Sequence, residues 1–197
     1  AGQAIALTSA CPREGKTMLT LSLAMALNAM KDQRAVILDC DLRRSRIAEL
    51  LNLSQGVALD SILLGQTCPL DAVRVDERFG LHVIPVVYRD AYSPDHLSRS
   101  AFAEIIRELK TRYDYVLVDT PPVLAVADTG LLASHCDQTY MVVRWRKTRH
   151  AQIRDVFERL YDLDINVTGT ILNFVNPKKE ANYRGIPYAS YNEYRHV

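Results

Sequence analysis

The sequence predicts a single α/β domain, built on a doubly wound and mostly parallel sheet with helices on both faces. Short runs of Val, Ile and Leu, typical of strands buried on both faces, alternate with longer stretches of helical spacing. The chain has 197 residues and 48% of them are apolar, which is sufficient for one sizeable core. Right-handed strand–helix–strand connections then arrange such a chain in layers around the sheet.

The first half of the chain supplies three strands and one long helix. Residues 3–9 (QAIALTS) form an apolar run expected to be a buried strand. Residues 16–31 carry apolar side chains on most faces, which predicts a helix in contact with the core. Two further strands are expected at 34–39 (RAVILD) and 81–87 (LHVIPVV), where Pro85 limits the hydrogen-bond ladder.

The second half continues the alternation and then loses it. The expected elements are an amphipathic helix at 99–112, a strand at 114–119 (DYVLVD), a helix at 125–135, a strand at 138–144 (QTYMVVR), a helix at 149–161 and a strand at 165–173 (INVTGTILN). After Asn176 the sequence is polar and contains proline and glycine. We therefore expect a domain over 1–176 and a flexible, tyrosine-rich tail over 177–197.

Composition excludes several classes of protein. The net charge of +1 gives no general attraction to nucleic acid, so no nucleic-acid partner is expected. The four cysteines form no C-x-x-C pair and no metal-binding spacing with histidine, which favours a reducing, cytoplasmic compartment. The longest apolar helical stretch, Met18 to Met30, is too short and too polar to cross a bilayer, and no signal peptide is present.

A phosphate-binding loop is predicted where SACPREGKTMLT follows the first strand. The stretch ends in Gly15-Lys16-Thr17 at the start of a helix, where backbone N–H groups and the helix dipole attract phosphate. Lys16 is expected to reach the β- and γ-phosphates, and the Thr17 hydroxyl to ligate Mg²⁺. Ala10 replaces the usual first glycine, and Arg13 requires either an uncommon backbone angle or a different loop path. The alternative is a chance Gly-Lys-Thr at a helix start.

Three aspartates follow two of the predicted strands. Asp39 and Asp41 stand two residues apart at the carboxyl end of the second strand, and Asp119 ends another strand. Ligands bind at this edge of α/β sheets, so the three carboxylates are expected beside the loop. Asp119 then has the place of a Walker B acid that holds Mg²⁺ directly or through water. The alternative for Asp39 and Asp41 is a helix N-cap and a solvated charge.

Together these motifs resemble the P-loop ATPases with deviant Walker motifs, the SIMIBI group of MinD and ParA. That group has a signature lysine five residues before the catalytic lysine, where this chain has Cys11. The chain more closely resembles the bacterial tyrosine kinases, the cytoplasmic domains of exopolysaccharide co-polymerases. The resemblance covers essentially the whole chain, in TSACPREGKT, VILDCDLRRSR, YDYVLVDTPPVLAVADTGLLA, MVVRWRKT and the C-terminal tyrosine run.

The resemblance implies an ATP-dependent protein-tyrosine autokinase that uses Mg²⁺. The residues expected to bind ATP are Arg13, Glu14, Gly15, Lys16, Thr17, Met18 and Asn173. The catalytic residues are expected to be Lys16, Asp39 and Asp41, and the metal ligands Thr17, Asp41 and Asp119. Asp39 would orient or deprotonate the incoming phenol, although the sequence also allows Asp39 and Asp41 to exchange their roles. Weaker candidates are Arg43, Arg44, Arg46 and Arg144.

The tail is the expected acceptor. Its phosphorylation sites are expected to be Tyr183, Tyr188, Tyr191 and Tyr194, four of the ten tyrosines in the chain. The resemblance implies a ring of identical subunits in which each tail enters the neighbouring site and the ring dissociates when the tails become charged. It also implies a membrane-spanning co-polymerase segment, upstream or on a separate chain, a tyrosine phosphatase, and a place at the cytoplasmic face of the bacterial inner membrane.

Two other functions compete with this one. An ATPase switch of the MinD and ParA type would require the lysine that Cys11 replaces, and it gives no reason for the tail tyrosines. A non-catalytic nucleotide-binding scaffold is favoured by the lost glycine at Ala10 and by Arg13.

Overall fold

The centre of the fold is a seven-stranded sheet in a computed structural model that describes residues 2–42, 44–53, 59–86 and 99–176. The strand order is β3-β4-β2-β5-β1-β6-β7, and every pairing is parallel except β3 with β4. The strands are β1 Gln3–Ser9, β2 Ala35–Asp39, β3 Arg74–Asp76, β4 Leu81–Ile84, β5 Tyr115–Asp119, β6 Gln138–Arg144 and β7 Gly169–Asn173. The predicted doubly wound, mostly parallel sheet is confirmed.

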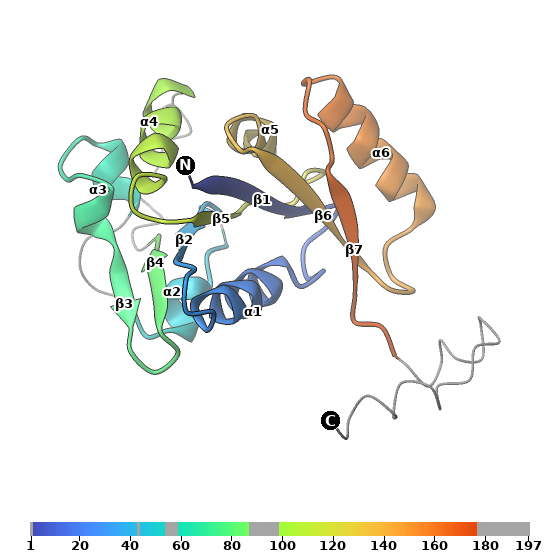
Figure 1. Ribbon diagram of the computed structural model, residues 1–197. Helices are drawn as coiled ribbons and strands as arrows, with labels where there is room; N and C mark the ends of the chain where they lie inside the picture. The colour runs from blue at the N-terminus through green and yellow to red at the C-terminus, as the bar shows by residue number, and fades with distance from the viewer. Residues whose placement is uncertain (1, 43, 54–58, 87–98, 177–197) are drawn as a thin grey trace.

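Helices cover both faces of this sheet. They are α1 Lys16–Asn28, α2 Ile47–Leu50, α3 Leu59–Leu63, α4 Arg99–Leu109, α5 Asp128–Ala133 and α6 His150–Tyr161, with a 3₁₀ turn at Leu70–Ala72. Figure 1 shows α1 and α2 on one side of the sheet and α4, α5 and α6 on the other. No helix in the described part of the chain is both long and apolar enough to cross a bilayer.

The strand β1 lies inside the sheet and divides the core into two faces, because its side chains alternate. Ala4 and Ala6 point to the side of α4–α6, where they join clusters that contain Phe102 and Leu160. Ile5 points to the other side and packs with Leu21 of α1. Both faces of β1 are therefore covered, as its unbroken apolar sequence predicts.

Most predicted elements occur in their expected places, with shorter ends. The last strand begins at Gly169 rather than at residue 165, and the helix expected over 125–135 is confined to α5. The sequence pattern did not reveal β3, α2 or α3, which have three to five residues each. Such segments are too short to establish a period. The predicted tail, 177–197, lies outside the described residues.

The strand order brings the predicted motifs to one edge. β2 and β5 lie on one side of β1, and β6 and β7 lie on the other, so the succession of strands reverses direction at β1. The connection that leaves the carboxyl end of β1 is the predicted phosphate-binding loop. Doubly wound sheets bind their ligands at such a reversal.

Candidate functional site

The loop after β1 has the backbone shape of a phosphate-binding loop although it has lost glycine. Arg13 has φ 67° and Gly15 has φ 92°, both in the left-handed region. A Cβ on Gly15 would lie 2.2 Å from Nδ2 of Asn173 and 2.8 Å from the Phe174 ring, so only glycine fits there. Of the two alternatives expected for Arg13, an uncommon backbone angle or a different loop path, the structure has the uncommon angle.

The two residues that follow Gly15 begin α1 and lie next to the end of β5. Lys16 is buried, and Thr17 donates a hydrogen bond of 2.6 Å from its hydroxyl to Oδ2 of Asp119. Because β5 is the direct neighbour of β1, the loop and this carboxylate are held together by the sheet itself. The structure therefore brings the predicted lysine, threonine and Walker B acid to one place.

Two carboxylates lie side by side beneath the loop. Asp39 and Asp119 are direct partners in the register of β2 and β5, and both are buried. Burial raises the pKa of Asp119 to about 6, with Asp41 adding to the rise, against the opposing effects of Lys16 and the Thr17 hydrogen bond. Burial, and then the charge of Asp119, raise the pKa of Asp39 well above its usual range.

One oxygen of this pair has no partner. Oδ1 of Asp119 is buried and has no hydrogen-bond partner among the described residues. A cation beside it would supply the missing partner and would compensate the carboxylate charge. No group of three or more His, Cys, Asp or Glu side chains in the described residues forms a metal site. Mg²⁺ usually takes one or two carboxylates together with substrate phosphates, and this donor set fits that requirement.

Asp39 and Asp41 differ in their access to solvent. Asp39 has no exposed surface: its Oδ2 accepts a hydrogen bond from the Ser45 hydroxyl, and its Oδ1 accepts one of 3.3 Å from the Asp41 N–H. Asp41 is half-buried and lines the pocket above. The two carboxylates therefore lie at different depths. Ser45 was not predicted, because its role depends on a contact with Asp39 that only the fold reveals.

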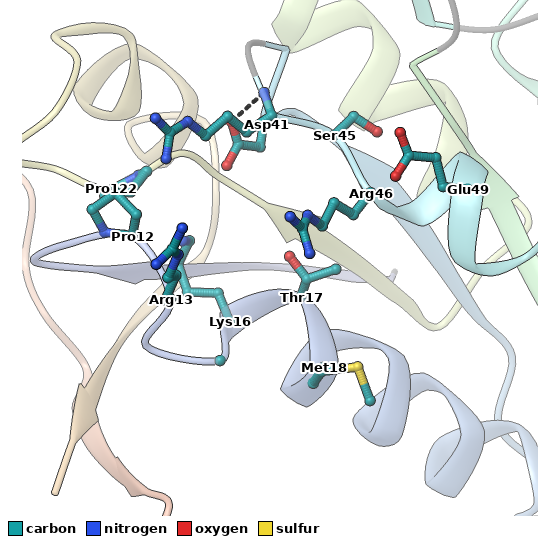
Figure 2. Close-up of a pocket in the computed structure, with 12 residues that line it drawn as sticks. Pro12, Arg13, Lys16, Thr17, Met18, Asp41, Ser45, Arg46, Glu49 and Pro122 are labelled. Carbon is teal, nitrogen blue, oxygen red and sulfur yellow. Dashed lines mark hydrogen bonds between the residues drawn. The ribbon is translucent and has the colours of Figure 1, made fainter.

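A pocket of about 550 Å³ lies in front of the loop. Its lining residues are Pro12, Arg13, Gly15, Lys16, Thr17, Met18, Asp41, Arg44, Ser45, Arg46, Glu49 and Pro122. Figure 2 shows Thr17 directly below the Arg46 side chain, with Arg13 to one side and Asp41 above. Four of the lining side chains are cations, Arg13, Lys16, Arg44 and Arg46, so the pocket suits a polyphosphate.

Two residues predicted to bind ATP do not line this pocket. The Glu14 carboxylate turns away toward the connection between β6 and α6, where it accepts a hydrogen bond from Thr148. The Asn173 amide donates a hydrogen bond of 3.1 Å to the Glu14 carbonyl, and Arg144 likewise donates one of 2.9 Å to the Arg13 carbonyl. These side chains contact the loop itself. Arg43 and the tail tyrosines lie outside the described residues.

Comparison with known proteins places this geometry in a family. Residues 3–147 match the family model described as an AAA domain. The tyrosine-protein kinase YwqD of Bacillus subtilis is 30% identical over 181 residues, which cover 92% of this chain and 76% of YwqD. The chain belongs to the bacterial tyrosine-protein kinases. The P-loop fold that it shares with this family implies nucleotide binding.

Solved structures agree with the membership in this bacterial tyrosine kinase family. The kinase domain of the Escherichia coli tyrosine kinase Etk superposes with a TM-score of 0.82 at 28% identity, covering 88% of this chain and 68% of that one. The VpsO kinase domain superposes with a TM-score of 0.80 at 34% identity, covering 89% and 86%. MinD of Aquifex aeolicus, at 23% identity and a TM-score of 0.73, shows a likeness of fold alone.

Some relatives in the bacterial tyrosine kinase family are much longer than this chain. The tyrosine-protein kinase ptk of Acinetobacter johnsonii is 30% identical over 179 residues, which cover 91% of this chain but 24% of ptk. The chain therefore spans about a quarter of the length of that relative.

Proposed function

We propose that this domain transfers the γ-phosphoryl group of ATP to tyrosine hydroxyls of proteins. The observation that carries the proposal is the Thr17–Asp119 hydrogen bond of 2.6 Å, which joins the phosphate-binding loop to a buried carboxylate that has one unpartnered oxygen. Relatives that match more than 90% of this chain are named tyrosine-protein kinases, which supports tyrosine as the acceptor.

In this proposal, different residues of the site bind the phosphates and the metal ion. Lys16 and the backbone N–H groups of residues 13–18 bind the β- and γ-phosphates, and the positive lining of the pocket compensates their charge. Thr17, Asp41 and Asp119 hold Mg²⁺, which when bound neutralises charge on the transferring phosphoryl group. MinD of Pyrococcus horikoshii, a protein of the same fold, was solved with Mg-ADP.

The acceptor side uses the one aspartate of the three that is not assigned to the metal. The tyrosine oxygen bonds to the γ-phosphorus as the bond from that phosphorus to the β–γ bridging oxygen breaks, and the phenolic proton passes to a carboxylate. We assign that carboxylate to Asp39, because its Oδ2 already accepts a hydrogen bond from a hydroxyl group, that of Ser45. The phenol reaches it where the Ser45 hydroxyl now donates its hydrogen bond, so Ser45 must turn aside.

Replacing each aspartate separately tests this assignment. Asp39→Asn is expected to lower kcat while leaving the dissociation constant for Mg-ADP within about threefold of wild type. Asp41→Asn is expected to weaken Mg-ADP binding. The reverse pattern would exchange the two roles, which their spacing in the sequence also permits.

We propose that the first acceptors are tail tyrosines of a neighbouring copy, Tyr183, Tyr188, Tyr191 and Tyr194. Gly185 and Pro187 between them disfavour regular secondary structure, and an acceptor peptide must extend into the site. In the proposal, identical subunits assemble next to a membrane-spanning co-polymerase segment at the inner membrane, and a phosphatase resets the tails. The output is control of exopolysaccharide synthesis and export. A relative 28% identical over 195 residues is the succinoglycan biosynthesis transport protein ExoP of Rhizobium meliloti, which supports that output.

A mixing experiment tests transfer between copies. A Lys16→Met chain keeps the tail and loses the phosphate-binding amine, whereas a chain with all four tail tyrosines replaced by Phe keeps the active site. Mixed with Mg-ATP, the pair is expected to yield phosphotyrosine on the Lys16→Met chain, measured by mass spectrometry. Each chain incubated alone is the control. Absence of transfer in the mixture, with an active wild-type chain alongside, rules out the route between copies.

The same assays separate the competing functions. Phosphate release without tyrosine phosphorylation would indicate an ATPase switch, a function disfavoured here because Cys11 stands in place of the signature lysine. Failure to bind Mg-ATP at all would indicate a scaffold.

A further inference from the structure

The phosphate-binding loop contains a buried acid that faces away from the pocket. Glu14 is 4% exposed, and both of its carboxylate oxygens accept hydrogen bonds. Oε2 accepts one of 2.8 Å from the Cys11 N–H, which spans the loop from one side to the other. Oε1 accepts one from the hydroxyl of Thr148, which follows β6. The carboxylate therefore joins two points of the loop to a separate part of the fold.

Thr148 continues this connection to the end of β6. Its hydroxyl donates to Glu14 and at the same time accepts a hydrogen bond of 2.9 Å from the Arg144 N–H. The Arg144 guanidinium donates a hydrogen bond of 2.9 Å to the Arg13 carbonyl and lies 4.6 Å from the centre of the Phe174 ring. Arg144 and Thr148 thus contact consecutive loop residues.

The contacts of Arg144 and Thr148 reach the loop at and next to Arg13, a residue whose side chain disfavours the backbone angle found there. Arg13 has a left-handed backbone, φ 67°, which costs energy for a residue with a Cβ and persists only where neighbours enforce it. Arg144 holds its carbonyl, and Thr148 holds the next side chain along. Glycine-rich loops adopt this backbone without such support.

We propose that Thr148 and Arg144 are positioning residues for the phosphate-binding loop. They act through Glu14 and the Arg13 carbonyl to keep the loop N–H groups directed at the nucleotide phosphates. This inference rests on the proposed function to the extent that the loop binds a nucleotide. It assigns a role to the MVVRWRKT segment, in which the hydroxyl of Thr148 is the essential group.

Direct titration of Mg-ADP by calorimetry tests the inference without depending on kinase activity. Thr148→Val removes the hydroxyl at similar volume and is expected to raise the dissociation constant at least tenfold. Thr148→Ser restores the hydroxyl and is expected to stay within threefold of wild type. Thr111→Val is the matched control, because the Thr111 hydroxyl donates to the Glu108 carbonyl on an exposed turn away from the loop. It is expected to bind as wild type does.

Several outcomes would overturn the inference. They are wild-type affinity in Thr148→Val, or equal weakening in Thr148→Ser and Thr148→Val, which would show that the hydroxyl is not what matters. If Thr148→Val does not fold, Arg144→Gln decides: the expected result is a several-fold weaker affinity, and wild-type affinity refutes the inference. Loss of tyrosine phosphorylation in a wild-type chain that still binds Mg-ADP would remove the proposed function alone.

Discussion

The buried carboxylate of Asp119 makes the stability of the folded chain depend on pH. Its carboxylate is buried next to Asp39, and only one of its oxygens accepts a hydrogen bond, from Thr17. A native pKa of about 6, above the ordinary value of 3.8, means that the folded chain binds a proton more tightly than the unfolded chain does. Stability from this group is therefore full at low pH and is lost as the pH rises through about 6.

Asp119→Asn is expected to stabilise the nucleotide-free protein at pH 8. Asn cannot ionise, and its side-chain carbonyl can still accept the hydrogen bond from Thr17, so the variant avoids the cost of a buried charge. The pKa shift from 3.8 to about 6 sets an upper limit of roughly 3 kcal/mol on the gain in the free energy of unfolding. The gain is expected to shrink as the pH falls from 6 to below 3.8, where wild-type Asp119 is protonated in both the folded and the unfolded chain. Urea unfolding at pH 8, 6 and 4.5 without Mg²⁺ measures it. A gain that does not change with pH would contradict the assignment.

Some residues of the site could be predicted from the sequence and others could not. The spacing of Lys16, Thr17 and Asp119 was sufficient to predict that they meet, because motif and strand order together fix the edge of the sheet. Ser45 and Thr148 could not be predicted. Each acts through one hydrogen bond to a residue on another element, and no local pattern encodes such a partner.

At the scale of elements, periodicity explains both success and failure. Strand 138–144 was predicted with its observed bounds because its centre is a run of aromatic, apolar and β-branched residues with polar residues at both ends. Residues 165–168 look like a strand, yet β7 begins only at Gly169, where pairing with β6 starts at Tyr140. Where a strand starts depends on its partner, which is a tertiary property. β3 exists only through its antiparallel pairing with β4.

The helix α4 packs on the sheet through a row of buried side chains, of which Phe102 is the largest. Phe102 has no exposed surface, lies in the cluster formed with β1, β2 and β5, and its ring centre is 6.0 Å from that of His135. Phe102→Ala is expected to destabilise the protein by about 3–5 kcal/mol, through lost burial and the cavity left behind.

Urea unfolding of two Phe→Ala variants measures this cost. Phe79→Ala is the matched control, since Phe79 is 49% exposed and is expected to cost less than about 1 kcal/mol. Equal losses for the two variants would show that α4 does not depend on this contact.

At the scale of the whole molecule, the site belongs to the centre of the sheet rather than to a peripheral loop. The loop follows β1, its acids end β2 and β5, and its supports come from the ends of β6 and β7. Five of the seven strands in the described sheet therefore contribute residues to the phosphate-binding loop, its acids or its supports. A ligand bound there contacts elements from both halves of the fold, so it is expected to stabilise the domain as a unit.

Mg-ADP at about one hundred times its dissociation constant is expected to stabilise the domain by about 2.7 kcal/mol. For a chain of this length, this corresponds to a rise in Tm of roughly 5–10 °C. Chelation of Mg²⁺ with EDTA is expected to remove much of the rise, because the carboxylates of Asp41 and Asp119, the proposed metal ligands, then face the phosphates without a cation. Lys16→Met, which loses the phosphate-binding amine, is the control and is expected to show little rise. Thermal unfolding followed by circular dichroism measures both effects. An equal rise in Tm with EDTA, or in Lys16→Met, would mean that ADP binds somewhere other than this edge of the sheet.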